Sequence, residues 1–363
     1  MPVADKAFFA MQYIKKIFLG LFLGANVLTV LLLWASCACT WISPSVVPQQ
    51  TVITLAFPIF LTANLAFVFF WLICKARLAV LPVLGTLVVG GYVMDYCPLH
   101  CQEDTPNDSS ILLVSHNIGT MTGEEKHLAF VQYVKETDAD ILCLQEVDPT
   151  LLTRKAFVAM LDSMGYGKMQ KDNRCILSKF PFAGGAESLA YTSTTGNGSM
   201  VCRLLCGPDT LLIVNNHLES YGLTDEEKGR YKKAIKHPES DETSGTVLTL
   251  ARRISNTAQI RGAQSDSLCA FIDSHAGESM IVCGDFNDTP ISYVYQQIGK
   301  RLDCAWRNSG QGIGLSYNQM GFFVRIDHIF HSSDWISHNT RIDNKMVLSD
   351  HYPLHTILCR KPN

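Results

Sequence analysis

Three long apolar runs near the N-terminus constrain this chain more than any other feature of its sequence. They extend over residues 17–38, 52–74 and 78–94. A helix needs roughly 20 apolar residues to span a bilayer, so the first two runs are long enough and the third is near the lower limit. None of them has the polar face of a helix at a soluble surface. The sequence therefore predicts two or three transmembrane helices within residues 1–96, which anchor the chain in a lipid bilayer.

Basic residues flank these runs unevenly. The loop 39–51 contains no Lys or Arg, whereas the N-terminus and the second loop contain Lys6, Lys15, Lys16, Lys75 and Arg77. Short cytoplasmic segments carry the excess of basic residues, so we expect the N-terminus in the cytoplasm. Three spans then place everything after residue 94 on the extracytoplasmic side of a plasma or inner membrane, which is the localisation that we predict. With only two spans the same part would be cytoplasmic.

The remainder of the chain differs sharply in composition. Residues 97–110 are polar and predict a linker, and residues 111–363 read as a soluble domain. From residue 110 onward, 25 Lys and Arg oppose 28 Asp and Glu. A nonspecific nuclease is expected to neutralise several phosphates with a basic groove. This charge balance makes nucleic acid a possible but not a favoured partner, and no protein partner is evident.

Cysteine usage leaves the compartment open. Two closely spaced pairs, Cys97 with Cys101 and Cys202 with Cys206, could close short disulfide loops in an oxidising compartment. Spacing alone does not establish that they do. No second Cys or His pair stands at the spacing of a zinc site, so a structural zinc is not expected.

Short apolar runs alternate with helical patterns beyond residue 110. Several of these runs are apolar throughout, as in sheets that are covered on both faces. The alternation predicts an α/β fold, a four-layer sandwich of two stacked mixed sheets flanked by helices. The expected strands are 111–115, 141–144, 175–177, 200–205, 211–215, 280–283, 325–330 and 354–358, and the expected helices are 126–137, 151–164 and 246–273.

Polar groups stand at the ends of these apolar strands. A carboxylate buried among apolar neighbours is costly unless it is paired or bound to a cation. Strands that end at one edge of a sheet bring such groups to one crevice, so we expect a single site. The patterns are Ser115-His116-Asn117-Ile118, Leu144-Gln145-Glu146-Val147, Asn215-Asn216-His217-Leu218, Gly284-Asp285-Phe286-Asn287-Asp288, Arg325-Ile326-Asp327-His328-Ile329 and Ser349-Asp350-His351-Tyr352-Pro353.

In this order, the six patterns resemble those of the endonuclease/exonuclease/phosphatase superfamily, the deoxyribonuclease-like metal-dependent phosphoesterases. The resemblance covers about residues 111–359, and the N-terminal spans suggest a bacterial-type member. The segment 173–181 also looks like the strand and turn that follow the first helices in this family. One departure is that a small residue usually stands where Arg174 or Cys175 is found, which could alter the wall of the pocket.

The resemblance implies a magnesium-dependent hydrolase, with manganese as an alternative ion. Glu146 would be the principal metal ligand, Asn117 a ligand or its neighbour, and Asp350 would complete the metal side. Hard oxygen donors of this kind suit Mg²⁺, which keeps several of its waters. A bound cation can stabilise the charge that develops on phosphorus during hydrolysis.

The resemblance also implies catalytic roles. Asp285 would deprotonate the attacking water, and Asn287 would hydrogen-bond a phosphate oxygen. His351 would donate to a non-bridging oxygen, with Asp327 holding its tautomer and favouring its charged form. His217 would contact the phosphate from the opposite side or help to protonate the leaving group.

Substrate identity is less constrained. Loops that leave a rigid sheet carry specificity, and the segment 219–262 is rich in basic residues. We assign Arg261 from this segment, and Arg174 at the pocket wall, to substrate binding. Membrane tethering favours a lipid or small-molecule phosphoester, acted on by a phosphodiesterase or phosphatase. The alternatives are a tethered nuclease and a catalytically silent receptor or scaffold, and the last would be expected to lack a site residue.

Overall fold

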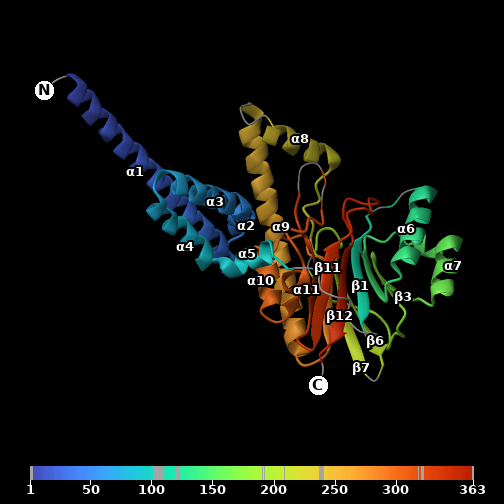
Figure 1. Cartoon of the computed structure of the whole chain (residues 1–363). Helices are drawn as coiled ribbons and strands as arrows, with labels where there is room; N and C mark the ends of the chain where they lie inside the picture. The colour runs from blue at the N-terminus through green and yellow to red at the C-terminus, as the bar shows by residue number, and fades with distance from the viewer. Residues whose placement is uncertain are drawn as a thin grey trace.

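The computed structural model describes residues 3–361, except 101–109, 120, 122, 190, 192, 208, 237–240, 318 and 320–322. A bundle of apolar helices projects from one side of an α/β domain, with the N-terminus at the far end of the bundle (Figure 1). Most of the predicted linker 97–110, together with Cys101, lies outside the described residues. The division of the chain at residues 96 and 110 stays a prediction.

The first sheet of the α/β domain has the strand order β11-β12-β1-β2-β4-β3. Only β1 and β2 are parallel in it, and their ends coincide because Asn117 pairs with Gln145. The bounds are β1 (Ile111–Asn117), β2 (Ile141–Gln145), β3 (Gly167–Lys171), β4 (Arg174–Ser178), β11 (Trp335–Ile342) and β12 (Leu354–Arg360).

The second sheet has the order β5-β6-β7-β8-β10-β9. Its parallel pair is β7 and β8, and the antiparallel strand β10 begins where β8 ends because Asp327 pairs with Asp285. The bounds are β5 (Glu187–Leu189), β6 (Gly198–Cys206), β7 (Asp209–His217), β8 (Met280–Asp285), β9 (Asp303–Cys304) and β10 (Asp327–His331).

The inner faces of the two sheets form one core. Leu113 and Ile141 of the first sheet belong to the same buried cluster as Ile213 and Ile281 of the second. Helices cover the outer faces, so the predicted four-layer sandwich is confirmed. The first sheet is flanked by α6 (Glu124–Thr137) and α7 (Lys155–Met164). The second sheet is flanked by α9 (Asp241–Ser274) and α10 (Tyr293–Gly299). The domain also contains the helices α8 (Asp225–Lys236) and α11 (Ala305–Ser309).

The apolar runs of the N-terminus form the anchor bundle, which consists of α1 (Val3–Ala38), α3 (Phe57–Cys74), α4 (Val80–Val88) and α5 (Gly90–Tyr96). Two helical segments, Met11–Trp41 and Phe57–Cys74, are long and apolar enough to cross a membrane. The third predicted run is bent by 66° between α4 and α5, so two helices are long and apolar enough to cross a membrane, or three if the bent pair counts as one.

Buried amide groups connect the helices of the anchor bundle. The side chain of Asn26 in α1 donates to that of Asn64 in α3 over 3.3 Å, and Asn64 donates to Thr86 of α4 over 2.9 Å. Small residues allow close helix packing in such bundles. A Cβ atom on Gly85 of α4 would lie 2.9 Å from Val30 of α1. The third run is thus packed into the bundle together with the first two.

The anchor bundle and the α/β domain share a packed junction. Ile291, which follows β8, is only 1% exposed and packs with Leu33 and Phe57 of the bundle. Short helices η1 (Cys39–Trp41) and α2 (Gln50–Leu55), between α1 and α3, lie against the domain, where Lys300 stacks 4.2 Å from the Trp41 ring. The bundle is therefore part of the folded body and more than a tether.

Cys202 and Cys206 do not form the short-loop disulfide that their spacing allows. Both lie in β6 as free thiols. Four residues along one strand separate their Cα atoms by roughly 13 Å, whereas a disulfide requires less than about 7 Å. The extended backbone explains why sequence spacing alone is a poor guide.

Asp95 of α5 holds the junction together and supplies a test of it. Its buried carboxylate accepts hydrogen bonds from Arg307 (2.6 Å) and Gln296 (2.9 Å), and its backbone carbonyl accepts one from Arg325. We expect Asp95→Ala to lower the free energy of unfolding by about 1–2 kcal/mol, because the hydrogen bonds that link α5 to Gln296 and Arg307 are lost. Thermal unfolding and limited proteolysis of the detergent-solubilised chain measure this. Asp162→Ala, at an exposed position of α7, is the matched control, and equal stability of the two variants would contradict the structural role of Asp95.

Candidate active site

Six predicted site residues lie at one edge of the sandwich. Asn117 ends β1, His217 ends β7 and Asp285 ends β8. Asp327 begins the antiparallel strand β10 opposite Asp285, and Glu146 directly follows β2. His351 approaches from the segment before β12 of the other sheet. The pairing of strands thus gathers residues that are up to 234 positions apart in sequence at a single place.

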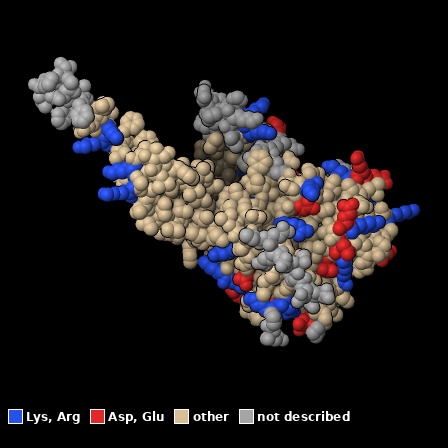
Figure 2. Space-filling view, viewed as in Figure 1, with Lys and Arg blue, Asp and Glu red and all other residues tan. Residues whose placement is uncertain are grey.

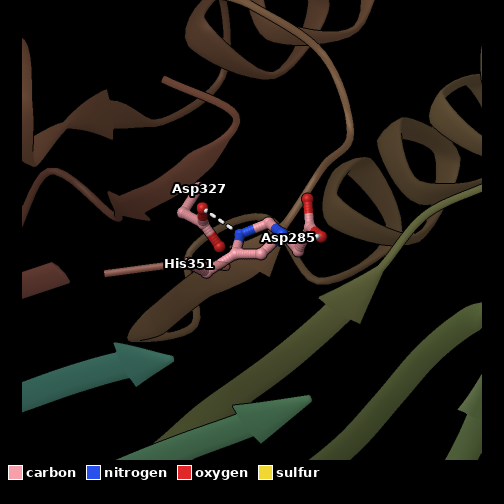
Figure 3. A group of neighbouring side chains, drawn as sticks. All are labelled: Asp285, Asp327 and His351. Atoms are coloured by element: carbon pink, nitrogen blue, oxygen red, sulfur yellow. Dashed lines mark hydrogen bonds and ion pairs between the residues drawn. The ribbon is translucent and has the colours of Figure 1, made fainter. Parts of the chain in front are cut away.

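Asp327, His351 and Asp285 form a row of side chains (Figure 3). His351 Nδ1 lies 2.8 Å from Asp327 Oδ2, and its Nε2 lies 3.6 Å from Asp285 Oδ2. The Ser316 hydroxyl accepts hydrogen bonds from the backbone N–H groups of Ile326 and Asp327. These contacts fix the orientation of the imidazole, and Tyr317 packs edge-on against it at 5.0 Å between ring centroids.

Asn117 joins the two carboxylates on the other side of the row. Its amide nitrogen donates to Glu146 Oε1 over 3.1 Å and to Asp285 Oδ2 over 3.0 Å. The backbone N–H of Asn287 donates to Asp285 Oδ1 over 2.8 Å. Asp285 is only 1% exposed to solvent, whereas the side chain of Glu146 is 37% exposed. Glu146 is therefore the carboxylate of this pair that is open to a diffusible ligand.

The backbone at these strand ends adopts sparsely populated conformations. Glu146 and Asn287 have φ angles of 54° and 51°, in the left-handed region that non-glycine residues seldom occupy. Gly284, which precedes Asp285, has φ 128°, and a Cβ atom there would lie 2.0 Å from the carbonyl oxygen of Asn216. Such strain is often found where a side chain must be aimed at a site.

A cavity of about 240 Å³ opens at this edge. Four carboxylates line it, those of Glu146, Asp285, Asp288 and Asp350, together with His217, Asn287 and His351. No Lys or Arg is found among the described residues of its lining. An anionic substrate would be repelled by this wall, so the donor set fits a divalent cation with hard oxygen ligands.

The described residues contain one compact group of potential metal ligands, Asp285, Asp327 and His351, whose donor atoms lie within 4.8 Å of one another. It is a possible metal site. Asp327 is fully buried, however, and His351 Nδ1 is already hydrogen-bonded to it. The more exposed oxygens of Glu146 are better suited to a hydrated Mg²⁺, which keeps several waters.

Burial and charge set the protonation of the row. Burial raises the pKa of Asp285 to about 7, against the opposing effect of the charge on His351. Burial alone would lower the pKa of His351, but the carboxylates of Asp327 and Asp285 outweigh it and raise the pKa to about 10. At neutral pH the row thus combines a carboxylate near its own pKa, suited to general-base work, with a charged imidazole.

His217 behaves differently from His351. Its Nε2 lies 3.5 Å from Glu146 Oε1 and 3.8 Å from Asp285 Oδ2. Burial, followed by the charges of His351 and Arg174, lowers the pKa of His217 to about 3. A neutral imidazole can exchange hydrogen bonds with a phosphate, but it is a poor proton donor to a leaving group.

The two arginines that we assigned to substrate binding do not line the cavity. Arg174 is 2% exposed and its guanidinium pairs with Asp172 at 2.7 Å. Arg261 is fully buried and donates to the Glu219 carbonyl and the Tyr221 hydroxyl, each over 2.9 Å. Both guanidinium groups are committed to the protein, so this geometry favours positioning roles. Direct contact with substrate stays a prediction.

Sequence reasoning missed several groups around the site. Tyr317 and Ser316 lie in an irregular segment before β10 with no periodic signal, and Leu55 of α2 lines the cavity although it belongs to the N-terminal apolar helices. Asp288 stands within a recognised pattern, and its carboxylate lies 3.5 Å from Arg261 Nε. Of these groups, only the pairing of Asp288 with a basic residue could have been predicted from the sequence, because a buried Asp needs a partner.

The fold and the residues at this edge of the sandwich together define the class of protein. It is a two-sheet α/β sandwich in which carboxylates, an amide and imidazoles converge at one cavity. The chain belongs to the endonuclease/exonuclease/phosphatase family, whose model matches residues 114–351. Members of this family are phosphoesterases and nucleases and typically depend on a divalent metal. A second family model, described as a domain of unknown function, matches residues 15–96. None of the curated proteins compared with the chain matches it.

Solved structures of family members resemble this chain over its α/β domain. The endonuclease/exonuclease/phosphatase protein of Bacteroides vulgatus is 16% identical, with 69% of this chain and 99% of that one covered, at a TM-score of 0.49. The catalytic domain of human Nocturnin with bound sulfate is 18% identical (71% and 97% covered, TM-score 0.48). Truncated Caenorhabditis elegans TDP2 is 18% identical (69% and 97% covered, TM-score 0.47).

The protonation of the row predicts a bell-shaped pH profile. Asp285 must be ionised to accept a proton, so kcat/KM should fall as the pH drops below about 7, and it should fall again near pH 10 as His351 loses its proton. Asp327→Asn removes a charge that raises the pKa of His351, so the alkaline limb should move to lower pH and the rate should fall by roughly 10- to 100-fold. Rates on a 4-nitrophenyl phosphodiester across the pH range test this.

Asp303→Asn, at an exposed position of β9, is the control for that profile and should leave both limbs in place. An alkaline limb that is identical in the Asp327→Asn protein and the unaltered protein would show that Asp327 does not govern His351.

Proposed function

We propose that this protein is a membrane-tethered hydrolase of phosphoesters that depends on a divalent cation, Mg²⁺ or alternatively Mn²⁺. The observation that carries the proposal is the cavity at the sheet edge, where Glu146, Asp285 and Asp350 converge without a lining Lys or Arg among the described residues. A phosphoester is anionic, so it requires a cation at such a wall. Family membership supports the same class of reaction.

In this proposal the chain's own groups divide the work around an attacking water. Asp285 accepts the proton of the water as its oxygen attacks phosphorus and the bond to the leaving oxygen breaks. The charged imidazole of His351 donates to a non-bridging oxygen, and Asp327 keeps its tautomer and charge. Asn287 hydrogen-bonds a phosphate oxygen. His217 contacts the phosphate from the opposite side, since its low pKa disfavours protonation of the leaving group.

Glu146, with Asn117 and Asp350, is the set that we propose for the cation. Glu146 and Asp350 both face the cavity, and the Asn117 amide already holds Glu146 beside Asp285. When bound, the cation would neutralise phosphate charge and stabilise the charge that develops in the transition state. This assignment separates the metal side of the cavity from the proton-transfer row Asp327–His351–Asp285.

The proposed localisation is the extracytoplasmic side of a plasma or inner membrane. The α/β domain packs on η1 and α2, the short helices that connect the spans α1 and α3. The basic side chains of the bundle gather at its opposite end, near the N-terminus (Figure 2). The positive-inside rule assigns that end to the cytoplasm, which supports an external domain.

Substitution of the two central carboxylates tests the activity. Glu146→Ala and Asp285→Ala should each lower turnover of a 4-nitrophenyl phosphodiester by about 100-fold or more. Glu146→Ala should in addition raise the Mg²⁺ concentration needed for half-maximal rate, and a chelator should abolish the activity of the unaltered protein. Glu187→Ala, exposed on β5, is the matched control. Retained turnover in the Asp285→Ala protein would remove this residue from the mechanism.

Orientation has its own test. A protease added to intact cells or right-side-out vesicles should digest the α/β domain without permeabilisation, because the domain is external in this proposal. Immunoblotting against a C-terminal tag measures the digestion. A domain that becomes sensitive only after the membrane is opened would place it in the cytoplasm, while leaving the chemistry of the site unaffected.

A further inference from the structure

The cavity at the sheet edge has two chemically different walls. One carries the carboxylates and imidazoles described above. Apolar side chains line the cavity as well, and we call them the apolar wall: Leu55, Leu223, Leu250, Ile254, Val324 and Ile326. A site built only to hold a phosphate and a cation has no use for such a wall, whereas amphipathic ligands need both surfaces in one cavity.

Leu55 connects the apolar wall to the membrane. It is the last residue of α2, and the span Phe57–Cys74 begins only two residues later. Several apolar side chains in and around α2 are strongly exposed, among them Trp41 (66%) and Val46 (74%). Exposed apolar side chains beside the end of a span are typical of the interface between bilayer and water. The apolar wall therefore begins at the height where the bundle leaves the bilayer.

Helix α9 continues this surface away from the bundle. Leu250 and Ile254 are four residues apart, so they lie on one face of the helix and both line the cavity. Val247 and Leu248, one turn earlier, are about half exposed. In the space-filling view, the surface of the bundle next to the domain is uncharged, whereas Lys, Arg, Asp and Glu gather below the junction and on the domain farther from the bundle (Figure 2). Exposed apolar side chains thus lie both beside α2 and on α9.

We infer that the substrate is a membrane lipid whose phosphoester reaches the carboxylate wall while its hydrocarbon chain lies against Leu55, Leu250 and Ile254. This inference rests on the proposed phosphoesterase function and names the substrate class. A nucleic acid fits the same cavity poorly, because protein sites for single strands combine cationic grooves with stacking aromatic rings. The described lining offers no Lys or Arg, its charged imidazole is already paired with Asp327, and Tyr221 and Tyr317 are its only phenol rings.

Matched esters that differ only in chain length test the inference. The full chain in phosphatidylcholine nanodiscs with Mg²⁺ is assayed on 4-nitrophenyl methyl phosphate and 4-nitrophenyl hexyl phosphate. Each buried methylene is worth roughly fourfold in affinity, so kcat/KM should be at least about tenfold higher for the hexyl ester. Leu55→Ala and Leu250→Ala should each reduce this ratio by about threefold or more. Leu128→Ala, at an exposed position of α6 and outside the cavity lining, should leave the ratio unchanged.

A binding measurement separates the two proposals. Calorimetry gives the Kd of methylphosphonate and hexylphosphonate, which are not hydrolysed, for the same nanodisc preparations. A preference for the hexyl compound that weakens in Leu55→Ala, without turnover of either ester, would support a hydrocarbon chain at the apolar wall but overturn the phosphoesterase function, and with it the lipid as a substrate. Equal rates and equal Kd values for short and long chains would overturn the inference and leave that function standing. Faster cleavage of single-stranded DNA than of the hexyl ester would overturn it in favour of a nuclease.

Discussion

Buried polar groups of one sheet find their partners on the other sheet, and the arrangement of the site depends on this constraint. Asp327 of the second sheet is fully buried and pairs with His351, which precedes β12 of the first. Asn117 at the end of β1 hydrogen-bonds Asp285 at the end of β8. An unpaired charge or amide at these depths would be costly, so the two sheets must end at the same height for these two pairs to form. The sandwich geometry and the cluster of site residues are thus two aspects of one requirement.

That requirement explains which features the sequence could predict. Apolar strands that end in a carboxylate or amide were visible in the order of residues, and the strands expected around residues 111, 141, 211, 280 and 354 are all present. Strands β3 and β5 escaped notice because they are short edge strands with a polar composition, such as Gly167–Lys171. Hydrogen bonds across the sheets have no local signature. The tertiary contacts of Arg261 with the Glu219 carbonyl and the Tyr221 hydroxyl have none either, whereas Asp172, the partner of Arg174, stands only two residues away and could have been noticed.

The anchor bundle contributes to the shape of the site as well as to its location. The segment that carries Asp285, Asn287 and Asp288 runs directly to Ile291, which is inserted between helices of the bundle. Arg325, two residues before Asp327, donates to the backbone of Asp95 at the end of α5. Two of the strands that supply site residues are therefore held by contacts with the bundle. Interfaces between loosely tethered domains are smaller and more polar, and they permit relative motion.

A fixed junction between the bundle and the domain would change the free energy needed to bring a membrane lipid, the substrate that we propose, from the bilayer to the site. Moving a hydrocarbon chain from lipid into water costs about 0.8 kcal/mol per methylene, which a freely diffusing enzyme has to overcome when it extracts a lipid. Here Leu55 lines the cavity two residues before the span begins, and the apolar wall is continuous with that point. A chain that slides along Leu55, Leu250 and Ile254 exchanges one apolar environment for another, so only the phosphoester has to move into water. In this proposal the carboxylate wall would act on a head group whose position along the membrane normal is set by the fold.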